Sequence, residues 1–511
     1  MTAGERLQQP FGTLPDLVRA HAAERPERLA VIGLGSALTY RDFDEAIDRV
    51  AAALQRDGLK PGDVAAVCAS ASSAYATVFL GILRAGVTVS PLAPGSTAES
   101  LAGMVEDCAA RILFLDREVA AALAPVADRL PALRVALDGS DAARPFETWM
   151  AEPGSPVAPV TVQPKGAFNI IYSSGTTGRP KGIVQPNSLR WAQFNRAAYT
   201  AETVSLVSTP LYSNTTLVSF LPTLANGGAV VLLPKFDAGE FLALAERHRV
   251  THAMLVPVQY RRLMQHRDFD AYDLSSFVIK YSTSAPFPAE LKAEVLRRWP
   301  GGLVEFYGMT EGGGSCALLA HEHPDKLSTV GKPMEGHDVR LIDEQGREVA
   351  AGEAGEVVGR SPAMMKGYHN QLDKTREAEW MSPEGLRFIR TGDVGRFDAD
   401  GFLTLIDRRK DMIISGGFNI YPSDLEAELT AHPEVVEASV FGVASETWGE
   451  TPVAAVVLKP GAELSAAELR VWVNGRVGKT QRLTELHLVD ALPRSAIGKV
   501  LKRELREMFS A

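Results

Sequence analysis

The densest group of chemically active side chains in this sequence lies at residues 173–182, where it reads SSGTTGRPKG. Glycines leave backbone N–H groups unobstructed, and the serine and threonine hydroxyls add further donors. Lys181 contributes a positive point charge. A loop of this composition suits a polyphosphate, although a glycine-rich surface turn has the same composition. It is not a Walker loop, because G-x-x-x-x-G-K-[ST] is absent from this stretch.

A second group of reactive side chains is the YGMTE motif at residues 307–311. It follows residues 303–306, which have the pattern of a strand, so it lies at a strand's carboxyl end, where open α/β sheets bind ligands. The Thr310 hydroxyl can bond the α-phosphate of a nucleotide, and the Glu311 carboxylate can hold Mg²⁺. Tyr307 can stack on adenine. The alternative is a glutamate in an ordinary turn.

Two shorter motifs also fit a nucleotide. In the TGD sequence at residues 391–393, an ionised Asp393 can accept hydrogen bonds from two ribose hydroxyls. The STSAP sequence at residues 282–286 has small side chains, which leave room for a flat base and for a second substrate. Each motif alone is also compatible with a plain turn.

These motifs occur together, and the chain resembles the adenylate-forming superfamily, which includes acyl-CoA synthetases, luciferases and the adenylation domains of peptide synthetases. The family loop reads roughly [YF]-[ST]-S-G-[ST]-[ST]-G-x-P-K-G, and residues 172–182 match it throughout. The resemblance extends from residue 14 to residue 508. Within the superfamily the sequence resembles acid–CoA ligases such as those of the 4-coumarate, benzoate and fatty-acid group.

The resemblance implies roles for residues whose own patterns say little. The family's catalytic lysine falls on Lys499, in the PRSAIGK motif at residues 493–499. A lysine there would bridge the acid's carboxylate and the α-phosphate and stabilise the negative charge of the transition state. Arg408 takes the place of a second ribose contact, and Lys410 that of a hinge. As alternatives, Lys499 would be a solvated cation at a helix start, and the charged run around Lys410 a solvated turn.

The resemblance therefore implies a catalytic set of Lys499, Thr310 and Glu311, with Glu311 also as the metal ligand. The implied ATP- and AMP-binding residues come from all the motifs above: Ser173, Ser174, Gly175, Thr176, Thr177, Gly178, Lys181, Ser284, Ala285, Pro286, Glu305, Phe306, Tyr307, Gly308, Thr310, Asp393 and Arg408. The implied CoA-binding residues are Ser415, Gly416, Gly417, Trp448 and Lys479. After Lys479 the chain continues with Thr480-Gln481, which departs from the family's usual Lys-x-Pro.

The resemblance also implies an acyl pocket, lined by Tyr212, Ser213, Val256, Tyr260, Tyr281 and Gly312. Amino-acid adenylation domains carry an aspartate early in the first of these segments. Residues 211–215 read LYSNT and contain none, which argues against an amino-acid substrate. Many acyl-CoA synthetases carry histidine where Ser213 stands. Because the implied lining is largely apolar and aromatic, we expect an aryl acid or a short to medium apolar acid.

The elements that must position these residues alternate between strand and helix patterns. Apolar spacing and short apolar runs predict, in order, a helix at 14–23, a helix at 40–57, a strand at 65–69, a helix at 75–85 and a strand at 87–91. A buried strand at 168–172 enters the first loop, and the alternation returns between residues 204 and 256. This order predicts parallel sheets with helices on both faces.

Later segments change character. Residues 335–406 contain short strand patterns joined by glycine and aspartate turns, and a compact α+β pattern follows from residue 411. The expected fold class is α/β: two parallel-sheet subdomains and a small β-rich subdomain in one large N-terminal domain, followed by a small mobile α+β domain. The expected boundaries are 1–407 for the acid and ATP site, 408–410 for the hinge and 411–511 for the domain with the catalytic lysine.

Composition excludes several other classes of protein. A chain of 511 residues is too long for one hydrophobic core, and its net charge of −9 argues against general nucleic-acid binding. Its 3 cysteines lack metal-ligand spacing and fit a reducing compartment. No signal peptide and no apolar run of membrane-spanning length are apparent. We expect a cytoplasmic monomer or homodimer whose partners are a small carboxylic acid and CoA, without nucleic acid or a membrane span.

The function expected from the sequence is that of an acid–CoA ligase with ATP, Mg²⁺ and CoA. It would convert the acid and MgATP to acyl-AMP and pyrophosphate, and then pass the acyl group to CoA after a domain rotation. Three alternatives stay open at this point. One is an acyl-AMP ligase that loads a carrier protein, and another is a non-catalytic nucleotide-binding relative. The third is a luciferase-like oxygenase, which would share these motifs and is excluded only by product analysis.

Overall fold

A computed structural model describes the chain at residues 1–173, 181–195, 198–408, 411–415, 418–445, 449–478, 481–495, 498 and 500–509. The chain divides into two compact units. The first unit comprises Met1–Leu327, Pro333–Asp338 and Arg360–Ile389, and the second comprises Ser328–Lys332, Val339–Gly359 and Arg390–Ala511. Among the described helices, none combines the length and the apolar character that a membrane crossing requires.

One sheet of the first unit carries the strand that enters the loop at 173–182. Its strand order is β19-β9-β8-β4-β3-β5-β6-β7. The central pairs are parallel, whereas β9 is antiparallel to β8 and to β19. Its strands are β3 (Val64–Cys68), β4 (Thr88–Pro91), β5 (Ile112–Leu115), β6 (Leu133–Ala136), β7 (Arg144–Pro145), β8 (Ala167–Ser173), β9 (Lys181–Pro186) and β19 (Gly367–Tyr368).

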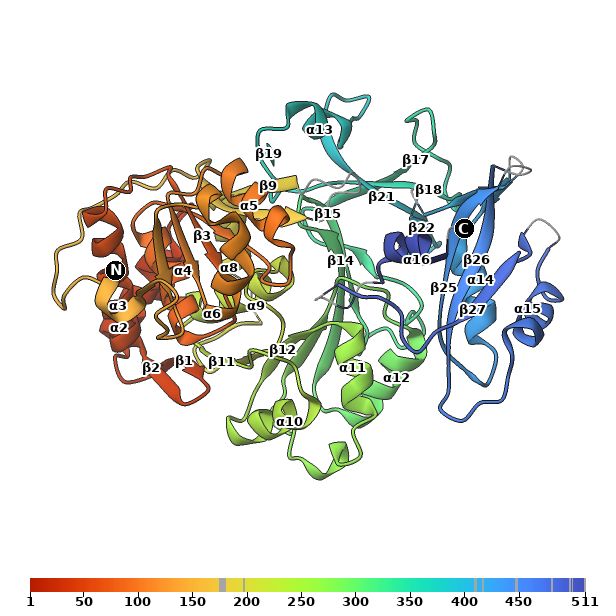
Figure 1. Ribbon diagram of the computed structural model, residues 1–511, viewed down its shortest axis with the longest axis horizontal. Coiled ribbons are helices and arrows are strands. Elements are labelled where there is room, and N and C mark those ends of the chain that lie inside the picture. Colours follow the sequence, from red (N-terminus) through yellow and green to blue (C-terminus); the bar gives the residue numbers. More distant parts are fainter. Residues whose placement is uncertain are drawn as a thin grey trace. The chain divides into compact units, whose positions relative to one another are not determined.

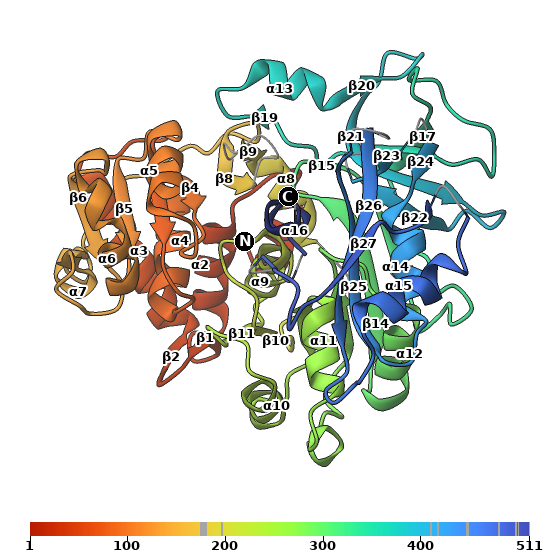
Figure 2. The ribbon, with the colours of Figure 1, turned by 45° about the vertical axis from the view of Figure 1, so that its right-hand side comes forward.

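Helices cover both faces of this sheet, as the alternation of buried residues along β3 requires. Ala65 and Val67 pack toward α3 (Tyr40–Arg56) and α4 (Ser73–Arg84). The alternate residues, Ala66 and Cys68, pack toward helices on the other face. The helices of that other face are α5 (Ala98–Asp107) and α6 (Arg117–Leu123). Figure 2 shows β4, β5 and β6 among these helices.

The second sheet of the first unit carries the YGMTE motif at the end of β14. Its strand order is β16-β15-β14-β13-β12-β10-β11-β1-β2. The hairpin β1–β2 joins this sheet through parallel pairing of β1 with β11. Residues that precede all strands of the first sheet in sequence therefore belong to the second sheet. Its strands are β1 (Leu29–Gly33), β2 (Ser36–Thr39), β10 (Val204–Val207), β11 (Ala229–Leu232), β12 (His252–Leu255), β13 (Ile279–Ser282), β14 (Gly302–Met309), β15 (Gly312–Leu319) and β16 (Lys332–Pro333).

Helices again lie on both faces of this second sheet (Figure 1). Tyr281 of β13 packs with Val218 of α9 (Asn214–Ala225). Its neighbour Lys280 points to the opposite face, where its ammonium donates to the Trp299 carbonyl, directly after α12 (Ala289–Arg298). The remaining helices of the first unit are α1 (Ala3–Leu7), α2 (Leu14–Glu24), α7 (Phe146–Trp149), α8 (Asn187–Phe194), α10 (Ala238–Arg247), α11 (Pro257–Met264), α12 (Ala289–Arg298) and α13 (Leu372–Glu377).

The second unit contains two small β-rich parts. The first part includes β17 (Asp338–Ile342), β18 (Gly355–Arg360), β21 (Arg387–Phe397) and β22 (Leu403–Arg408), and β20 (Glu379–Met381) pairs with the start of β21. The second part has the strand order β24-β23-β26-β25, with β27 beside β26. Its strands are β23 (Ile413–Ser415), β24 (Phe418–Ile420), β25 (Val435–Ser445), β26 (Gly449–Leu458) and β27 (Glu485–Leu488).

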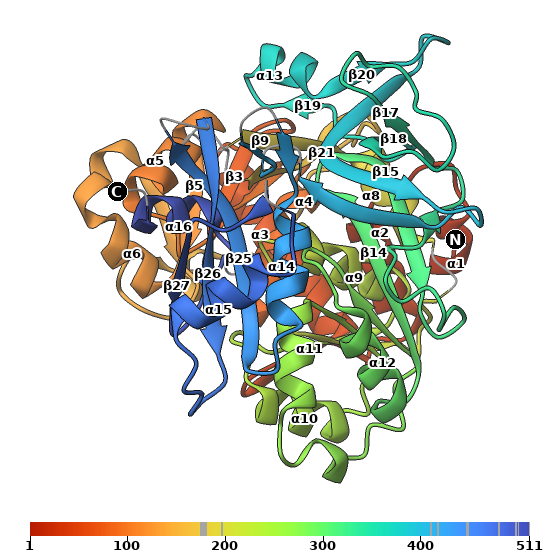
Figure 3. The same cartoon turned by 90° about the vertical axis from the view of Figure 1, so that its right-hand side faces the viewer.

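Helices cover the sheet of the C-terminal part (Figure 3). Val440 and Val456 pack with α14 (Pro422–Thr430) and α15 (Ala466–Asn474). The alternate positions Phe441 and Ala455 pack with Leu505 of α16 (Lys502–Phe509) on the other face. Alternation along β25 and β26 therefore places the helix that follows the PRSAIGK motif on its own face of this sheet.

The predicted α/β class is confirmed, with mixed parallel sheets and a smaller C-terminal domain. The helix predicted at 40–57 is α3, and the strand predicted at 65–69 is β3, each within one residue at both ends. Thr39 explains the sharp start of α3, because its hydroxyl accepts from the Asp42 amide while the Asp42 carboxylate accepts from the Thr39 amide. The hinge and the domain boundaries at 408–410 stay predictions.

Candidate active site

The YGMTE turn, between β14 and β15, is held by contacts from two other segments. Gln185 of β9 donates from Nε2 to the Thr310 carbonyl at 2.7 Å. The Met365 amide donates to the Glu311 carbonyl at 2.7 Å, and the Tyr368 hydroxyl donates to Glu311 Oε1 at 2.9 Å. Both predicted catalytic residues of this turn are therefore fixed through their backbone, and Glu311 also through its side chain.

Gly312 closes this turn at a point where no side chain fits. Its φ is +86°, in the left-handed region that favours glycine. A Cβ at this position would lie 2.0 Å from the Ala363 carbonyl oxygen and 2.8 Å from Met364 Cα. The close approach of the 363–365 backbone is what allows Met365 to bond Glu311. Besides its predicted role in the acyl pocket, position 312 therefore requires glycine so that the 363–365 backbone can approach the turn.

Tyr368 connects the first loop to the YGMTE turn. The Lys181 ammonium lies 5.0 Å from the centroid of the Tyr368 ring, a cation–π distance. Burial and the adjacent Glu311 carboxylate raise the pKa of Tyr368, so its hydroxyl stays protonated and donates. The structure thereby brings together Lys181 and Glu311. Tyr368 was not predicted from the sequence, since it lies on a two-residue strand whose pairing with Ile183 of β9 is distant along the chain and leaves no local pattern.

Two predicted substrate loops meet at a pair of hydroxyls. Thr215 Oγ1 and Ser284 Oγ lie 2.6 Å apart. Ser284 has φ +79°, which is rare for a residue with a Cβ and places strain in the STSAP loop. Ser213 directly precedes α9, and its hydroxyl accepts from the Thr215 amide at 3.3 Å. The serine that replaces the family's common histidine therefore serves as a helix cap here.

Aromatic rings form an apolar cluster on the α9 side of the second sheet. Tyr281 stacks on Phe306 with centroids 5.6 Å apart and on Tyr199 at 6.2 Å. Val218 of α9 packs against the same cluster. Tyr281 is buried, whereas Phe306 stays partly exposed. Tyr212, on the loop before α9, is half-buried, and burial raises its pKa to about 12.

Two residues predicted for the acyl pocket lie in a different environment. Tyr260 is fully buried, stacks on Phe287 with centroids 5.0 Å apart and packs beside Trp299. Its hydroxyl donates to the Tyr281 carbonyl at 2.9 Å. Val256 is buried at the start of α11. The Tyr260 ring is thus not part of the Tyr199–Tyr281–Phe306 cluster, although its hydroxyl supports the backbone of that cluster.

Glu305 is predicted in the ATP-binding set, and its side chain is engaged elsewhere. It forms an ion pair with Lys292 of α12, and both residues are buried. Lys292 also donates to the Leu327 carbonyl at 2.6 Å. Burial raises the pKa of Glu305 to about 7, while the Lys292 ammonium opposes that rise. Tyr307, two positions on, is 9% exposed and pairs with Cys316 across β14 and β15.

The second unit carries the two predicted ribose contacts on neighbouring strands. Asp393 of β21 and Arg408 of β22 are backbone partners in the antiparallel ladder. Gly392 has φ +72°, and the Asp393 amide donates to Thr391 Oγ1 at 3.0 Å. The Thr391 hydroxyl in turn donates to the Val357 carbonyl at 2.8 Å. The turn that presents Asp393 is therefore fixed within this unit.

The PRSAIGK loop in the C-terminal part is held by hydrogen bonds from the Arg494 guanidinium, called the brace below. Arg494 donates from Nη1 to the Gly498 carbonyl at 2.7 Å and from Nη2 to Glu437 Oε2 at 2.7 Å. Arg494 and Val500 also form an antiparallel bridge. The guanidinium thus ties the two sides of the loop to each other and to β25. Ser415, predicted to contact CoA, lies at the end of β23 opposite Gly449.

Several predicted residues lie outside the part of the chain that the structure describes. They are Ser174, Gly175, Thr176, Thr177, Gly178, Lys410, Gly416, Gly417, Trp448, Lys479 and Lys499. The side chains of Ser173 and Arg408 are likewise not described. The roles of these residues stay predictions.

The donor set near Glu311 suits a magnesium ion that arrives with its nucleotide. The described residues contain no group of three or more histidine, cysteine, aspartate or glutamate side chains that could hold a metal by themselves. Mg²⁺ in nucleotide sites is bound by one or two carboxylates together with substrate phosphates and water. Glu311 supplies such a carboxylate, so the residues present fit the ion.

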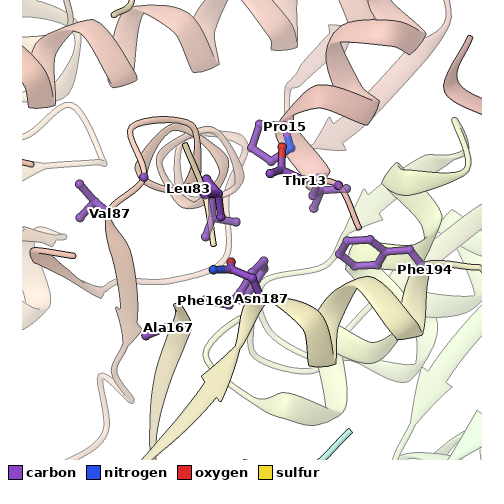
Figure 4. A pocket seen from close by; sticks show the side chains of 12 residues that line it. Thr13, Pro15, Leu83, Val87, Ala167, Phe168, Asn187 and Phe194 are labelled. Atoms are coloured by element: carbon purple, nitrogen blue, oxygen red, sulfur yellow. The ribbon is translucent and has the colours of Figure 1, made fainter. Parts of the chain in front are cut away.

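A small cavity lies away from these residues, between the first sheet and α2. It has a volume of about 30 Å³, room for about one water molecule. Thr13, Leu83, Phe168, Asn187 and Phe194 are among the side chains around it (Figure 4). Among the predicted site residues that the structure describes, none lines it. Its size and position give it no part in the candidate site.

The chain is similar to named enzymes along most of its length. It is 35% identical to a feruloyl-CoA synthase from Amycolatopsis sp., over 95% of this chain and 96% of that protein. It is 34% identical to the rice 4-coumarate–CoA ligase-like 9, over 97% of this chain and 93% of that protein. It is also 31% identical to the fatty acid–[acyl-carrier-protein] ligase ScoC from Streptomyces coeruleorubidus, over 99% of this chain and 98% of that protein.

Solved structures agree with these sequence relationships. The amide bond synthetase McbA from Marinactinospora thermotolerans superposes with a TM-score of 0.86 at 28% identity, over 98% of this chain and 100% of that one. The ATP-bound structure of MatB from Rhodopseudomonas palustris superposes with a TM-score of 0.85 at 29% identity, over 96% of this chain and 99% of that one.

Two family models match the chain. The model of the AMP-binding enzyme covers residues 18–369, and that of the AMP-binding enzyme C-terminal domain covers residues 424–499. The first match contains Lys181, Thr310, Glu311 and Tyr368, whose contacts hold the turn described above, and the second contains Lys499. Several relatives are named CoA ligases or CoA synthases. The chain belongs to the AMP-binding family of adenylate-forming enzymes.

Proposed function

We propose that this enzyme is an AMP-forming acid–CoA ligase. A carboxylate oxygen of the acid attacks the α-phosphorus of MgATP, and the bond to pyrophosphate breaks to give acyl-AMP. The sulfur of CoA then attacks the acyl carbon, and AMP leaves. The observation that carries the proposal is the linked group of Lys181, Tyr368 and Glu311 beside Thr310. The relatives named as CoA ligases support the choice of acceptor.

The residues of the first unit would act on the triphosphate. Lys181, held beside the Tyr368 ring, places an ammonium where the loop at 173–182 would receive phosphates. The Thr310 hydroxyl would bond the α-phosphate, and Glu311, oriented by Tyr368, would bind the metal. Bound Mg²⁺ would neutralise charge on the phosphate oxygens. Asp393 would accept hydrogen bonds from the ribose hydroxyls, with Arg408 as its neighbour on the next strand.

Lys499 would supply charge in the adenylation step. Negative charge gathers between the carboxylate and the α-phosphate in the transition state, and an ammonium that bridges them both positions and stabilises them. The brace from Arg494 to Gly498 supports this role, because it fixes the residue directly before Lys499. A surface lysine without a positional role would not require such a brace.

The acid would be an aryl or a short to medium apolar carboxylic acid. The cluster of Tyr199, Tyr281 and Phe306 offers flat apolar surfaces, and Phe306 is partly exposed. The small side chain of Ser213, at the start of the loop's junction with α9, leaves space beside these surfaces. An apolar or aromatic acyl group would gain most from such surfaces.

The second half-reaction would use the predicted CoA set and a rotation of the C-terminal domain. We place the domains at 1–407 and 411–511, with the hinge at 408–410 and Lys410 as its pivot. Ser415, Gly416, Gly417, Trp448 and Lys479 would contact CoA. Two sets of neighbours are needed because the two half-reactions have different nucleophiles, and a domain rotation supplies each set in turn.

A second candidate is a ligase that delivers the acyl group to another acceptor. The fatty acid–carrier-protein ligase ScoC and the amide bond synthetase McbA both match nearly the whole chain. They show that this architecture serves acceptors other than CoA. The adenylation half-reaction would be the same in each case, so the acceptor is the property to test.

Product analysis with purified protein separates these acceptors. The enzyme would be incubated with MgATP and a panel of aryl and aliphatic acids, with CoA, a phosphopantetheinylated carrier protein or a simple amine. We expect acyl-CoA with at least one aryl or apolar acid, and Lys499→Ala to lose acyl-AMP formation. Lys459→Ala, at an exposed lysine of the C-terminal part, is the matched control and should behave as wild type. Acyl transfer to the carrier protein or the amine, but not to CoA, would overturn the CoA assignment.

A further inference from the structure

A fully buried guanidinium lies where three segments of the candidate site meet. Arg190, on α8, is 0% exposed. Its Nη2 donates to Gln185 Oε1 and, at 2.9 Å, to Asn214 Oδ1. Its Nη1 donates to Gln193 Oε1 at 3.1 Å, and the guanidinium carbon lies 5.7 Å from the centroid of the Phe168 ring. The contacts join β8, β9 and the start of α9.

Gln185 extends this contact to the YGMTE turn. It is 1% exposed on β9 and donates from Nε2 to the Thr310 carbonyl at 2.7 Å. A backbone carbonyl only accepts and a guanidinium only donates, so both ends of the Gln185 amide are determined by their partners. The Thr310 backbone is therefore linked to Arg190 through one side chain.

Asn214 extends the contact in the other direction, to the predicted acid-binding loop. It is the first residue of α9 and directly follows Tyr212 and Ser213. The next residue, Thr215, shares the 2.6 Å hydrogen bond with Ser284 of the STSAP loop. Arg190 thus also fixes the point at which the first segment of the proposed acyl pocket ends.

The burial of Arg190 makes these links rigid. A charge removed from water is strongly unfavourable unless its donors are satisfied, so a movement of Gln185 or Asn214 away from the guanidinium is resisted. Both amide oxygens accept from the same nitrogen, Nη2. The Thr310 carbonyl, through Gln185, and the start of α9, through Asn214, are therefore both linked to one nitrogen atom.

We propose that Arg190 is a positioning residue for adenylation, which acts through Gln185 on Thr310 and through Asn214 on the acid-binding loop. It would keep the α-phosphate contact and the acid's carboxylate at the separation that attack requires. The proposal rests on the proposed function, in which Thr310 binds the α-phosphate and the loop with Tyr212 and Ser213 borders the acid. Arg190 itself contacts neither substrate in this proposal.

The nucleotide side of the link is tested by Gln185→Glu. A glutamate keeps an acceptor for Arg190, but it presents an oxygen in place of the N–H that Thr310 accepts. We expect kcat for acid-dependent pyrophosphate release to fall about 10- to 100-fold, because a misplacement of about 1 Å can slow a positioned reaction about 100-fold. ATP affinity, measured by calorimetry, should weaken, while KM for the acid should change little.

The acid side of the link is tested by a pair of variants at Asn214. Asn214→Asp keeps the oxygen that accepts from Arg190, so we expect wild-type kinetics. Asn214→Leu removes that oxygen and should raise KM for the acid about tenfold with little change in ATP affinity, since only the α9 end of the link is lost. A purely structural role for these residues would not separate the two substrates in this way.

Arg190→Met removes the shared donor and should impair both substrates. When Gln185→Glu is added to Arg190→Met, it should cause little further loss, because Arg190→Met already breaks the link through Gln185. Arg84→Met is the matched control, since Arg84 is a buried guanidinium of α4 that bonds Asp44 and Asp48 of α3, away from the site. It should lower the thermal midpoint comparably and leave kcat and KM unchanged.

Three results would overturn the proposal. They are kinetic losses in Arg84→Met equal to those in Arg190→Met, Gln185→Glu with wild-type kcat and ATP affinity, or equal effects of the Gln185 and Asn214 variants on both substrates. If the wild type releases no pyrophosphate with any acid, the proposed function fails instead. ATP calorimetry then decides the positioning role, which requires weaker binding in Gln185→Glu and Arg190→Met than in Arg84→Met.

Discussion

Gly312 directly follows the predicted catalytic residue Glu311 and lies against the backbone of residues 363–364. We predict that Gly312→Ala abolishes adenylation, because its Cβ would lie 2.0 Å from the Ala363 oxygen. The backbone at 363–365 would have to move, and the Met365 amide would lose the Glu311 carbonyl. Pyrophosphate release should fall about 100-fold or more, in line with misplacement of a catalytic group by about 1 Å.

A glycine with the same backbone conformation but open surroundings provides the control for this change. Gly385 has φ +76°, and no atom lies within 4 Å of the position of its Cβ. Gly385→Ala should therefore show only the cost of the left-handed conformation, about 1–2 kcal/mol of folding free energy. Activity in Gly385→Ala should stay at the wild-type level. Equal activity losses in both variants would mean that backbone strain alone, and not the contact with Ala363, accounts for the effect.

Tyr368 is the second residue with a separable role, because its ring and its hydroxyl serve different partners. Tyr368→Phe keeps the ring beside Lys181 and removes the hydrogen bond to Glu311. Loss of a hydrogen bond to a charged group costs about 1.5–3 kcal/mol, so adenylation should slow about 10- to 100-fold. The Mg²⁺ concentration for half-maximal pyrophosphate release should rise. An unchanged Mg²⁺ dependence would contradict the role given to Tyr368.

The buried pair of Lys292 and Glu305 predicts a pH dependence of stability. Burial raises the pKa of Glu305 to about 7 from 4.5, so between these values the folded chain holds a proton that the unfolded chain has lost. Stability from this group is therefore greatest at low pH and decreases as the pH rises through that window. In the double variant Lys292→Met/Glu305→Leu this decrease should be absent, as measured by urea unfolding at pH 5 and pH 8.

The same variant tests the nucleotide role predicted for Glu305. Its side chain is engaged by Lys292 on the α12 side of the sheet, so any contact with ATP would come from its backbone. We expect the double variant to keep pyrophosphate release within about threefold of wild type, because replacement of a buried ion pair by apolar residues of similar volume is often neutral or stabilising. A larger loss of activity with normal stability would place the Glu305 carboxylate in the ATP site.

At the scale of elements, the loop between β27 and α16 is the part whose position matters most for chemistry. Arg494 fixes the Gly498 carbonyl and is itself held by Glu437 of β25. We predict that Arg494→Ala slows adenylation about tenfold or more, since a misplaced Lys499 would no longer stabilise the transition state. Conversion of pre-made acyl-AMP to thioester should be nearly unaffected, because that step does not use Lys499 in the proposal.

An exposed ion pair in the same unit is the control for this loop. Arg476 Nε and Glu428 Oε2 lie 2.8 Å apart on the surface. Such pairs contribute at most about 1 kcal/mol, so Arg476→Ala should leave both half-reactions unchanged. The role of the brace would be refuted if Arg494→Ala slowed both half-reactions equally.

The elements themselves were largely predictable from the sequence. Apolar spacing predicted α3, and the short apolar run of β3 predicted a strand. Long-range pairing was not predictable, because nothing local indicates that β1 pairs with β11 or that β19 pairs with β9. For the same reason the motifs gave Thr310 and Glu311, whereas Tyr368 and Arg190 needed the structure: their roles depend on contacts between distant segments.

At the scale of the whole molecule, the predicted nucleotide contacts are divided between the two units. Lys181, Thr310 and Glu311 belong to the first unit, whereas Asp393 and Arg408 belong to the second. The predicted catalytic lysine also falls in the second. In the proposed mechanism, catalysis therefore requires groups from both units, and a rotation about the predicted hinge would change which of them act together.

The central claim is that the protein forms acyl-AMP from ATP and a carboxylic acid. Exchange of labelled pyrophosphate into ATP, measured without CoA, tests it most directly, because exchange requires a reversible adenylation step and no acyl acceptor. We expect Mg²⁺-dependent exchange that appears only when a suitable aryl or apolar acid is added, and that is lost in Lys499→Ala. Absence of exchange with every acid tested, or exchange of equal rate in Lys499→Ala, would mean that the protein does not form acyl-AMP in the proposed way.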